Sequence, residues 1–72
     1  MDVVLEDRLD RVAAVEIKLA ASVAPHDLKG LASLRDALGD HFVRGVIMYT
    51  GQKIIPMGDR IFAVPLGMMF FN

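Results

Sequence analysis

The first part of the chain alternates apolar and polar residues in a way that predicts a β-hairpin. Residues 2–7 and residues 12–19 are rich in β-branched and small apolar side chains, and Arg8-Leu9-Asp10 between them is typical of a turn. Successive side chains of a strand point to opposite faces of a sheet. Each of these strands therefore has one apolar face and one face that carries charges.

The length of the turn decides which faces of the two strands join, because opposed residues of an antiparallel pair share a face. A three-residue loop places Asp2 opposite Glu16 and Val3 opposite Val15. A two-residue loop would mix charged and apolar positions on both faces. We therefore expect the three-residue loop.

A helix is expected over residues 25–38, and a buried strand over residues 42–49. The helix starts at a proline, which suits a first turn, and ends before a glycine, which is a good terminator. Gly30 inside it suggests close packing on a sheet. The order strand, helix, strand predicts that residues 12–19 and 42–49 run parallel, with the later strand in the centre and covered on both faces. The apolar stripe of the helix consists of Leu28, Leu31, Ala32, Leu34 and Leu38.

Beyond that strand the sequence predicts two shorter extended segments, over residues 53–57 and 60–64, and an apolar tail over residues 66–71. Together these elements predict one α/β domain over residues 1–72. Its sheet is small and mixed, with about four strands, and one main helix packs on one face.

Composition narrows the functional class. The chain has 72 residues, of which 54% are hydrophobic and 24% charged, which excludes an intrinsically disordered segment. Eight basic and nine acidic residues give a formal charge of −1, so charge does not indicate nucleic acid as a partner. The absence of cysteine fits a reducing compartment. The acidic start of the chain and the lack of a long apolar run lead us to expect a soluble, cytoplasmic protein without a membrane span.

The triplet Glu16-Ile17-Lys18 is the first candidate for chemistry. Residues two apart on a strand project to the same face, so Glu16 and Lys18 lie together, and Asp2 joins them if the loop has three residues. Two carboxylates can hold a hard cation such as Mg²⁺ or Mn²⁺ while the lysine orients or deprotonates a water, as metal-assisted phosphodiester hydrolysis requires. The alternative interpretation is a solvated hairpin face with a surface ion pair.

The remaining polar residues do not predict a second site. His26 and His41 are far apart in sequence and no cysteine accompanies them, so we interpret them as polar residues at the starts of the helix and of the next strand rather than as zinc ligands. The chain contains no G-x-x-x-x-G-K-[ST] motif, so no ATP site is expected in it.

Five segments carry a family resemblance: residues 2–6 (Asp-Val-Val-Leu-Glu), 15–20 (Val-Glu-Ile-Lys-Leu-Ala), 28–31 (Leu-Lys-Gly-Leu), 45–51 (Gly-Val-Ile-Met-Tyr-Thr-Gly) and 61–66 (Ile-Phe-Ala-Val-Pro-Leu). In this order they resemble the C-terminal domain of unknown function that follows the ATPase module in a large family of prokaryotic AAA-type ATPases. That domain resembles the restriction-endonuclease-like fold, whose signature is P-D, a spacer and (D/E)-x-K.

The resemblance implies roles for individual residues. Asp2 matches the acid of the first strand, Glu16 the second acid and Lys18 the catalytic lysine, while the carbonyl of Ile17 is a further metal ligand. Met1 stands where the family usually continues upstream. On this resemblance we expect the chain to lack the helix and strand that open the nuclease core. The implied fold is the C-terminal half of a restriction-endonuclease-like fold.

Two functions of different classes follow as hypotheses. The first is a nuclease-like domain of an ATPase-family protein, with metal-dependent hydrolysis that is weak or lost. The second is a non-catalytic module for oligomerisation or protein interaction. We also expect a homodimer or larger assembly, because residues 2–7 or another flank would form an exposed sheet edge and the tail over residues 66–71 is strongly apolar.

Overall fold

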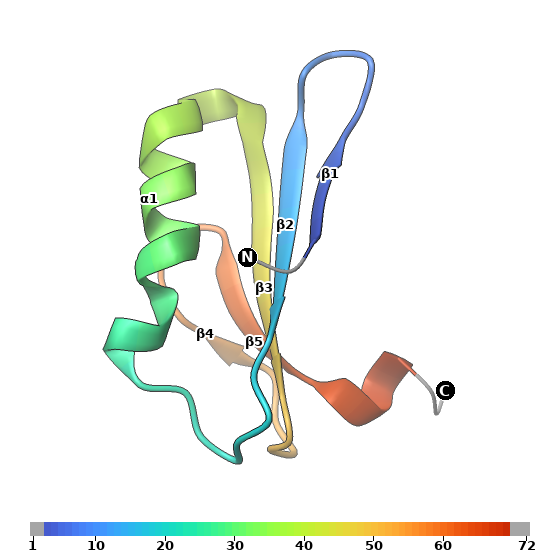
Figure 1. The fold of residues 1–72 in the computed structure, drawn as a ribbon, viewed down its shortest axis with the longest axis vertical. Coiled ribbons are helices and arrows are strands. Elements are labelled where there is room, and N and C mark those ends of the chain that lie inside the picture. The colour runs from blue at the N-terminus through green and yellow to red at the C-terminus, as the bar shows by residue number, and fades with distance from the viewer. Residues whose placement is uncertain (1–2, 70–72) are drawn as a thin grey trace.

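The computed structural model describes residues 3–69, which form an α/β structure with one mixed sheet and one main helix (Figure 1). The strands of this part of the chain lie in the order β1-β2-β3-β5-β4. The strands are β1 (Val3–Glu6), β2 (Val12–Ile17), β3 (Phe42–Tyr49), β4 (Ile55–Pro56) and β5 (Ile61–Pro65), and the helices are η1 (Pro25–Leu28), α1 (Lys29–Leu38), η2 (Gly39–His41) and η3 (Leu66–Met69). The predicted fold class is confirmed. The strand beyond the expected four is the short β4.

The hairpin of β1 and β2 has the predicted register. Val3 pairs with Val15 in an antiparallel ladder, as the three-residue loop requires. The carboxylate of Asp7 accepts hydrogen bonds from the backbone N–H groups of Leu9, at 2.8 Å, and Arg11, at 3.0 Å. Asp10 has φ of 60°, a conformation that aspartate tolerates better than most residues. Hydrogen bonds to the Asp7 side chain therefore stabilise the three-residue loop that the alternation of apolar and charged residues predicts.

The centre of the sheet is parallel. β2 pairs with β3, and β3 pairs with β5, both in parallel, so β3 is the central strand as predicted. Consequently the C-terminal ends of β2, β3 and β5 all lie at the same end of the sheet, which is the lower end in Figure 1. The short β4 pairs antiparallel with β5 at the far side.

One face of the sheet packs against α1. Leu31 of this helix is fully buried, and Gly45 of β3 lies beneath it. A Cβ at Gly45 would lie 3.3 Å from Leu31 Cδ2 and 2.9 Å from Phe42 Cζ, so the glycine permits this close approach. Gly30, in contrast, is exposed, so the expectation that it packs closely on the sheet is wrong. The core cluster consists of Ala14, Leu31, Phe42, Ile47, Tyr49, Ile61 and Ala63.

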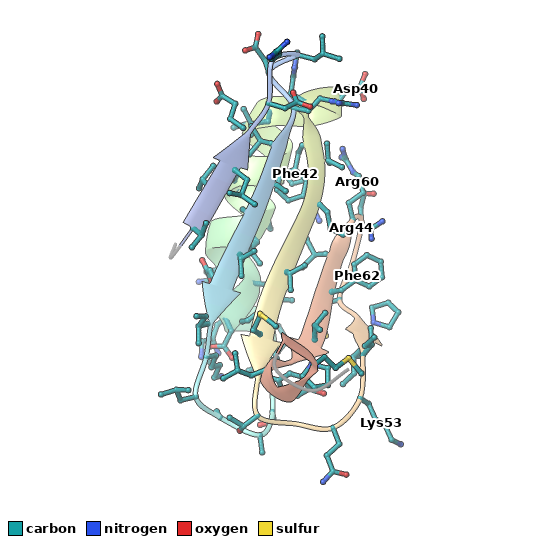
Figure 2. The ribbon with its side chains drawn as sticks, turned by 90° about the vertical axis from the view of Figure 1, so that its right-hand side faces the viewer. Asp40, Phe42, Arg44, Lys53, Arg60 and Phe62 are labelled. Atoms are coloured by element: carbon teal, nitrogen blue, oxygen red, sulfur yellow. The ribbon has the colours of Figure 1, made fainter. Side chains whose placement is uncertain are left out.

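The other face of the sheet is largely uncovered by the described residues. Seen from this side, η3 crosses the end of the sheet and the rest of the face is bare (Figure 2). The expectation that β3 is covered on both faces is therefore wrong for its first half, where Val43 and Arg44 are exposed. By strand pairing and alternation, what we call the open face comprises Val3, Leu5, Ala13, Val15, Ile17, Arg44, Val46, Met48, Phe62 and Val64. Of these residues, Met48 is buried.

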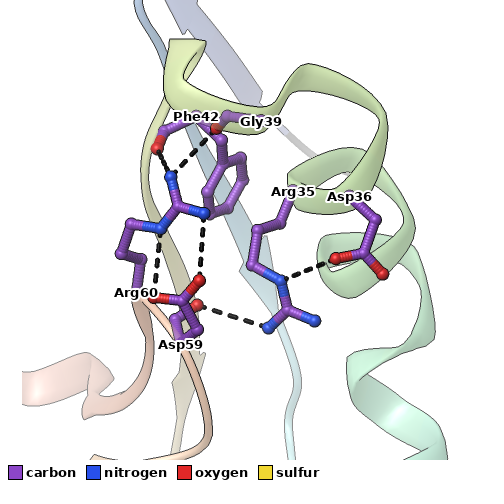
Figure 3. A network of polar contacts seen from close by, with 6 residues as sticks. All are labelled: Arg35, Asp36, Gly39, Phe42, Asp59 and Arg60. Carbon is purple, nitrogen blue, oxygen red and sulfur yellow. Dashed lines mark hydrogen bonds and ion pairs between the residues drawn. The ribbon is translucent and has the colours of Figure 1, made fainter.

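Arg60 connects the start of β5 to the turn that follows α1 (Figure 3). Its Nη1 donates to the carbonyl oxygens of Gly39, at 2.9 Å, and Phe42, at 2.6 Å. The guanidinium lies over the ring of Phe42, 5.6 Å from its centroid, and Asp59 accepts two hydrogen bonds from it. The side-chain hydrogen bond from Arg60 holds the pKa of Asp59 below its ordinary value.

Within residues 3–69, none of the helices has the length and apolar character needed to cross a membrane.

Candidate functional site

Glu16 and Lys18 lie on the α1 side of the sheet, near the end of β2. Glu16 alternates with the buried Ala14, so both side chains point towards the helix layer, and Glu16 is half-buried. Lys18 directly follows β2, and its backbone N–H donates to the carbonyl of Met48 at 2.7 Å, which continues the pairing with β3. The charged face of the hairpin is thus the one that meets the helix layer.

The predicted site is only partly within the described residues. Asp2 lies outside them, while Glu16 and Ile17 belong to β2. Within residues 3–69, no three histidine or carboxylate side chains gather in a way that could hold a metal ion. In this range, Glu16 and Ile17 are the residues that remain of the predicted metal-binding set.

Lys18 forms an ion pair that the sequence did not suggest. Its Nζ contacts Oδ2 of Asp27 in η1, and the two side chains are 29% and 16% exposed. The same oxygen accepts the N–H of Ala24 at 2.8 Å, and Oδ1 lies 3.4 Å from Nε2 of His26. Asp27 therefore closes the first turn of the helical segment and binds the lysine at the same time.

The charge state of Asp27 follows from these contacts. The hydrogen bond from Lys18, together with that from the Ala24 N–H, holds the pKa of Asp27 below its ordinary value of 3.8. An ionised Asp27 fixes the lysine side chain at the end of β2, on the side where Glu16 lies. The carboxylate of Glu16 and the ammonium of Lys18, which is paired with Asp27, therefore both lie on the α1 side of the sheet at the end of β2.

The sequence predicted the position of Asp27 in the first turn of a helix but not its ion pair with Lys18. A carboxylate in the first turn of a helix is a common pattern, and Asp27 fits it. Its contact with Lys18 crosses a loop between β2 and η1, so no strand or helix period relates the two residues. Their separation of nine positions carries no signal of its own.

A hollow of about 410 Å³ lies at the hairpin turn, where Glu6, Asp7 and Arg11 are among its lining residues. Two more hollows also lie away from Glu16, Lys18 and Asp27. One of about 540 Å³ is lined by residues 50–52 and 65–68, where β3 and β5 end, and none of these residues is titratable. The other, of about 250 Å³, lies on the open face beside Ile54. There the guanidinium of Arg44 lies 5.2 Å from the ring centroid of Phe62, and both residues are labelled in Figure 2.

Comparison with protein families identifies the domain. The family model for DUF4143, described as a domain of unknown function, matches residues 1–69. The chain belongs to the DUF4143 family. The expectation of a domain of unknown function over nearly the whole chain is confirmed, and the match includes both the Lys18–Asp27 pair and the open face of this DUF4143 domain. No curated protein and no solved structure shows significant similarity to it.

Proposed function

We propose that this DUF4143 domain is nuclease-like, and that Asp2, Glu16 and Lys18 act together in metal-dependent hydrolysis of a phosphodiester. The observation that carries the proposal is the hairpin register. Val3 pairs with Val15, and the same register continued by one residue would set Asp2 opposite Glu16. Glu16 and Lys18 already lie on one side of the sheet.

The donor groups in this set fit a hard divalent cation. The carboxylates of Asp2 and Glu16 and the carbonyl of Ile17 are the oxygen ligands that Mg²⁺ and Mn²⁺ take. The bound metal would supply charge neutralisation and an acidified water. Lys18 would orient that water or stabilise charge on the phosphate, and Asp27 would keep the ammonium at the end of β2.

The wider context is also proposed. The family resemblance supports a role as the C-terminal domain of an ATPase-family protein, in which ATP binding belongs to the ATPase module. The formal charge of −1 offers no general attraction for nucleic acid, so we expect weak activity.

Plasmid nicking in Mn²⁺ tests the hydrolysis. We expect slow nicking by the wild type and a loss of about 100-fold or more in Glu16→Gln and in Lys18→Met. The matched control is Glu6→Gln, which alters an exposed glutamate at the other end of the hairpin and should leave nicking unchanged. A wild type without metal-dependent nicking, or equal nicking by all variants, would contradict the proposal.

A second candidate function, a non-catalytic interaction module, is favoured by the open face. On it Val3, Leu5 and Ile17 are 45%, 59% and 49% exposed. Calorimetric titration with Mg²⁺ and Mn²⁺ separates the two functions, because only hydrolysis requires a metal site. Heat of binding that disappears in Glu16→Gln supports hydrolysis, whereas no heat with either metal supports the interaction module.

A further inference from the structure

The two edges of the sheet differ in how their backbone groups are protected. Among the described residues, β1 forms one edge and the short β4 forms the other. Backbone N–H and C=O groups that are unpaired at an edge can bind a further strand, and native proteins block such edges with proline, lysine or a bulge. The residues whose backbone groups face outward therefore decide which edge can accept a strand.

A proline occupies the outward-facing position of β4. The N–H of Met57 donates to the carbonyl of Ile61 at 2.8 Å, so the backbone groups of Met57 face β5. Successive residues of an antiparallel strand direct their backbone groups to alternate sides, so those of Pro56 face away from the sheet. Because proline has no N–H, the β4 edge offers no donor at this position.

β1, in contrast, presents free donors and acceptors along its outer side. The N–H of Asp7 donates to the carbonyl of Arg11 at 3.1 Å, so the backbone groups of Asp7 face β2. By alternation those of Leu5 also face β2, while the N–H and C=O groups of Val4 and Glu6 point outward. All four residues of β1 are exposed, and none of them is proline or lysine. This edge can therefore accept a strand.

We propose that β1 pairs with β1 of a second copy of this chain, in antiparallel orientation about a two-fold axis at Leu5. In this register Val4 lies opposite Glu6 of the partner subunit, and each such pair exchanges two backbone hydrogen bonds. The edge is complementary to itself, because Val4 and Glu6 each present one donor and one acceptor. The two sheets form one continuous sheet.

Charge and apolar contact select this register. It places each glutamate against a valine, whereas an axis at Glu6 would oppose two glutamates and an axis at Val4 would set Glu6 against Asp2. At the proposed axis Leu5 meets the partner's Leu5 in a non-hydrogen-bonded pair, in which side chains approach most closely. Leu5 is 59% exposed in the single chain, so the pairing buries apolar surface.

The two-fold pair also accounts for both edges of the sheet. In Figure 1 no other described element runs along the free side of β1, so a second strand has access to it. Pairing of β1 with β4 of another copy would repeat without closing and would meet the outward-facing Pro56. Pairing of β1 with β1 protects the exposed edge of both copies at once. The outer edges of the dimer are then the two β4 strands.

The inference rests on the second proposed function, the interaction module, and does not require hydrolysis. Glu16 belongs to β2 and Lys18 follows it, so substitutions at the candidate site leave the outer side of β1 unchanged. A monomeric chain would reject the pairing, whereas the metal titration decides between hydrolysis and the interaction module. The two failures are therefore distinguishable.

Sedimentation equilibrium of the full chain, at micromolar to millimolar concentrations, tests the pairing. We expect a mass of twice 7.9 kDa at the upper concentrations. Val4→Pro removes an outward-facing N–H but no hydrogen bond to β2, and should weaken association by about 10-fold or more. Val4→Thr is the matched control, because it keeps the N–H and the branched side chain, and should associate like the wild type. Circular dichroism reports whether each variant is folded.

A second pair of variants tests the position of the axis. Leu5→Lys brings two ammonium groups together at the axis and should weaken association by about 10-fold or more. Leu19→Lys adds the same charge at a position that is 80% exposed in the loop after β2, and should remain a dimer. If Val4→Pro does not fold, these two variants decide.

Amide hydrogen exchange identifies the contact directly. In the dimer the amides of Val4 and Glu6 should be protected, and their protection should disappear on dilution. The amide of Leu5, which faces β2, should stay protected throughout. A chain that is monomeric at all these concentrations would overturn the proposal. A dimer in which the amides of Val4 and Glu6 exchange freely, or which folded Leu5→Lys leaves intact, would also overturn it by placing the contact elsewhere.

Discussion

At the scale of single residues, Gly45 sets how closely the helix approaches the sheet. The position of its missing side chain is surrounded by Phe42, Leu31 and Ile61, at 2.9, 3.3 and 3.3 Å from an added Cβ. Interiors are packed densely enough that one extra methyl group forces its neighbours to move.

Gly45→Ala should therefore lower the free energy of unfolding by about 1–3 kcal/mol, measured by urea denaturation. Gly67→Ala is the matched control, because no atom lies within 4 Å of its added Cβ. Equal effects of the two substitutions would show that Gly45 is not at the point of closest contact.

The Lys18–Asp27 ion pair makes stability depend on pH in a definite direction. The pKa of Asp27 is lowered in the folded chain by the hydrogen bond from Lys18. A carboxyl with a lowered pKa in the folded state stabilises the fold above its unfolded pKa. That stabilisation is lost as the pH falls through the lower, folded pKa. The contribution of Asp27 is therefore present at neutral pH and disappears in acid.

We expect Asp27→Asn to lower the midpoint of thermal unfolding by a few degrees at pH 7, and the difference from wild type to vanish as the pH falls below 3.8. Asp36→Asn, which alters a pair whose carboxylate is 71% exposed, should change the midpoint less. A difference that is the same at all pH values would contradict the ion-pair explanation.

At the scale of the elements, α1 packs on the sheet around one fully buried side chain. Leu31 is fully buried in the core cluster, while other leucines of the helical segment are only partly buried around it. The sequence predicted the apolar stripe, because its period of three and four residues is a local property. It did not indicate which leucine would lie over Gly45, since that depends on how the helix sits on the sheet.

Leu31→Ala should cost about 2–5 kcal/mol of unfolding free energy, by lost burial and by the cavity it leaves. Ser33→Ala, at an exposed position of the same helix, should change stability by less than about 0.5 kcal/mol. Urea denaturation measures both. A loss at Leu31 no larger than that at Ser33 would mean that α1 does not depend on this contact.

The hairpin shows what could be predicted from the sequence and what could not. The register, in which Val3 pairs with Val15, could be predicted, because only the three-residue loop places the apolar residues of both strands on the same face. Which face would meet the helix did not follow, since this depends on the side of the sheet to which the chain crosses after β2. The structure turns the charged face of the hairpin, with Glu16, towards α1 and leaves the apolar face open.

Two tertiary contacts also lay beyond sequence reasoning. Asp27 meets Lys18 across a loop, and Arg60 reaches the carbonyl of Gly39 from 21 positions away. Arg60 also has φ of 59°, which no periodic pattern predicts for an arginine. Such contacts depend on how separate elements pack together, so the local sequence pattern does not predict them.

At the scale of the whole molecule, the two sides of the sheet differ in chemistry. The α1 side carries the half-buried Glu16 and the ion pair of Lys18 with Asp27. The other side is the apolar open face. The charged residues of β1 and β2 therefore lie on the side of the sheet opposite to the apolar open face.

Nuclear magnetic resonance with substoichiometric Mn²⁺ tests most directly whether the charged end of β2 is a metal site. A paramagnetic ion broadens the amide signals of the residues nearest to it. We expect selective broadening of the signals of Glu16, Ile17 and Lys18 in the wild type, and its loss in Glu16→Gln. Signals that remain sharp, or broadening centred on His26 or His41 instead, would contradict the metal-dependent site.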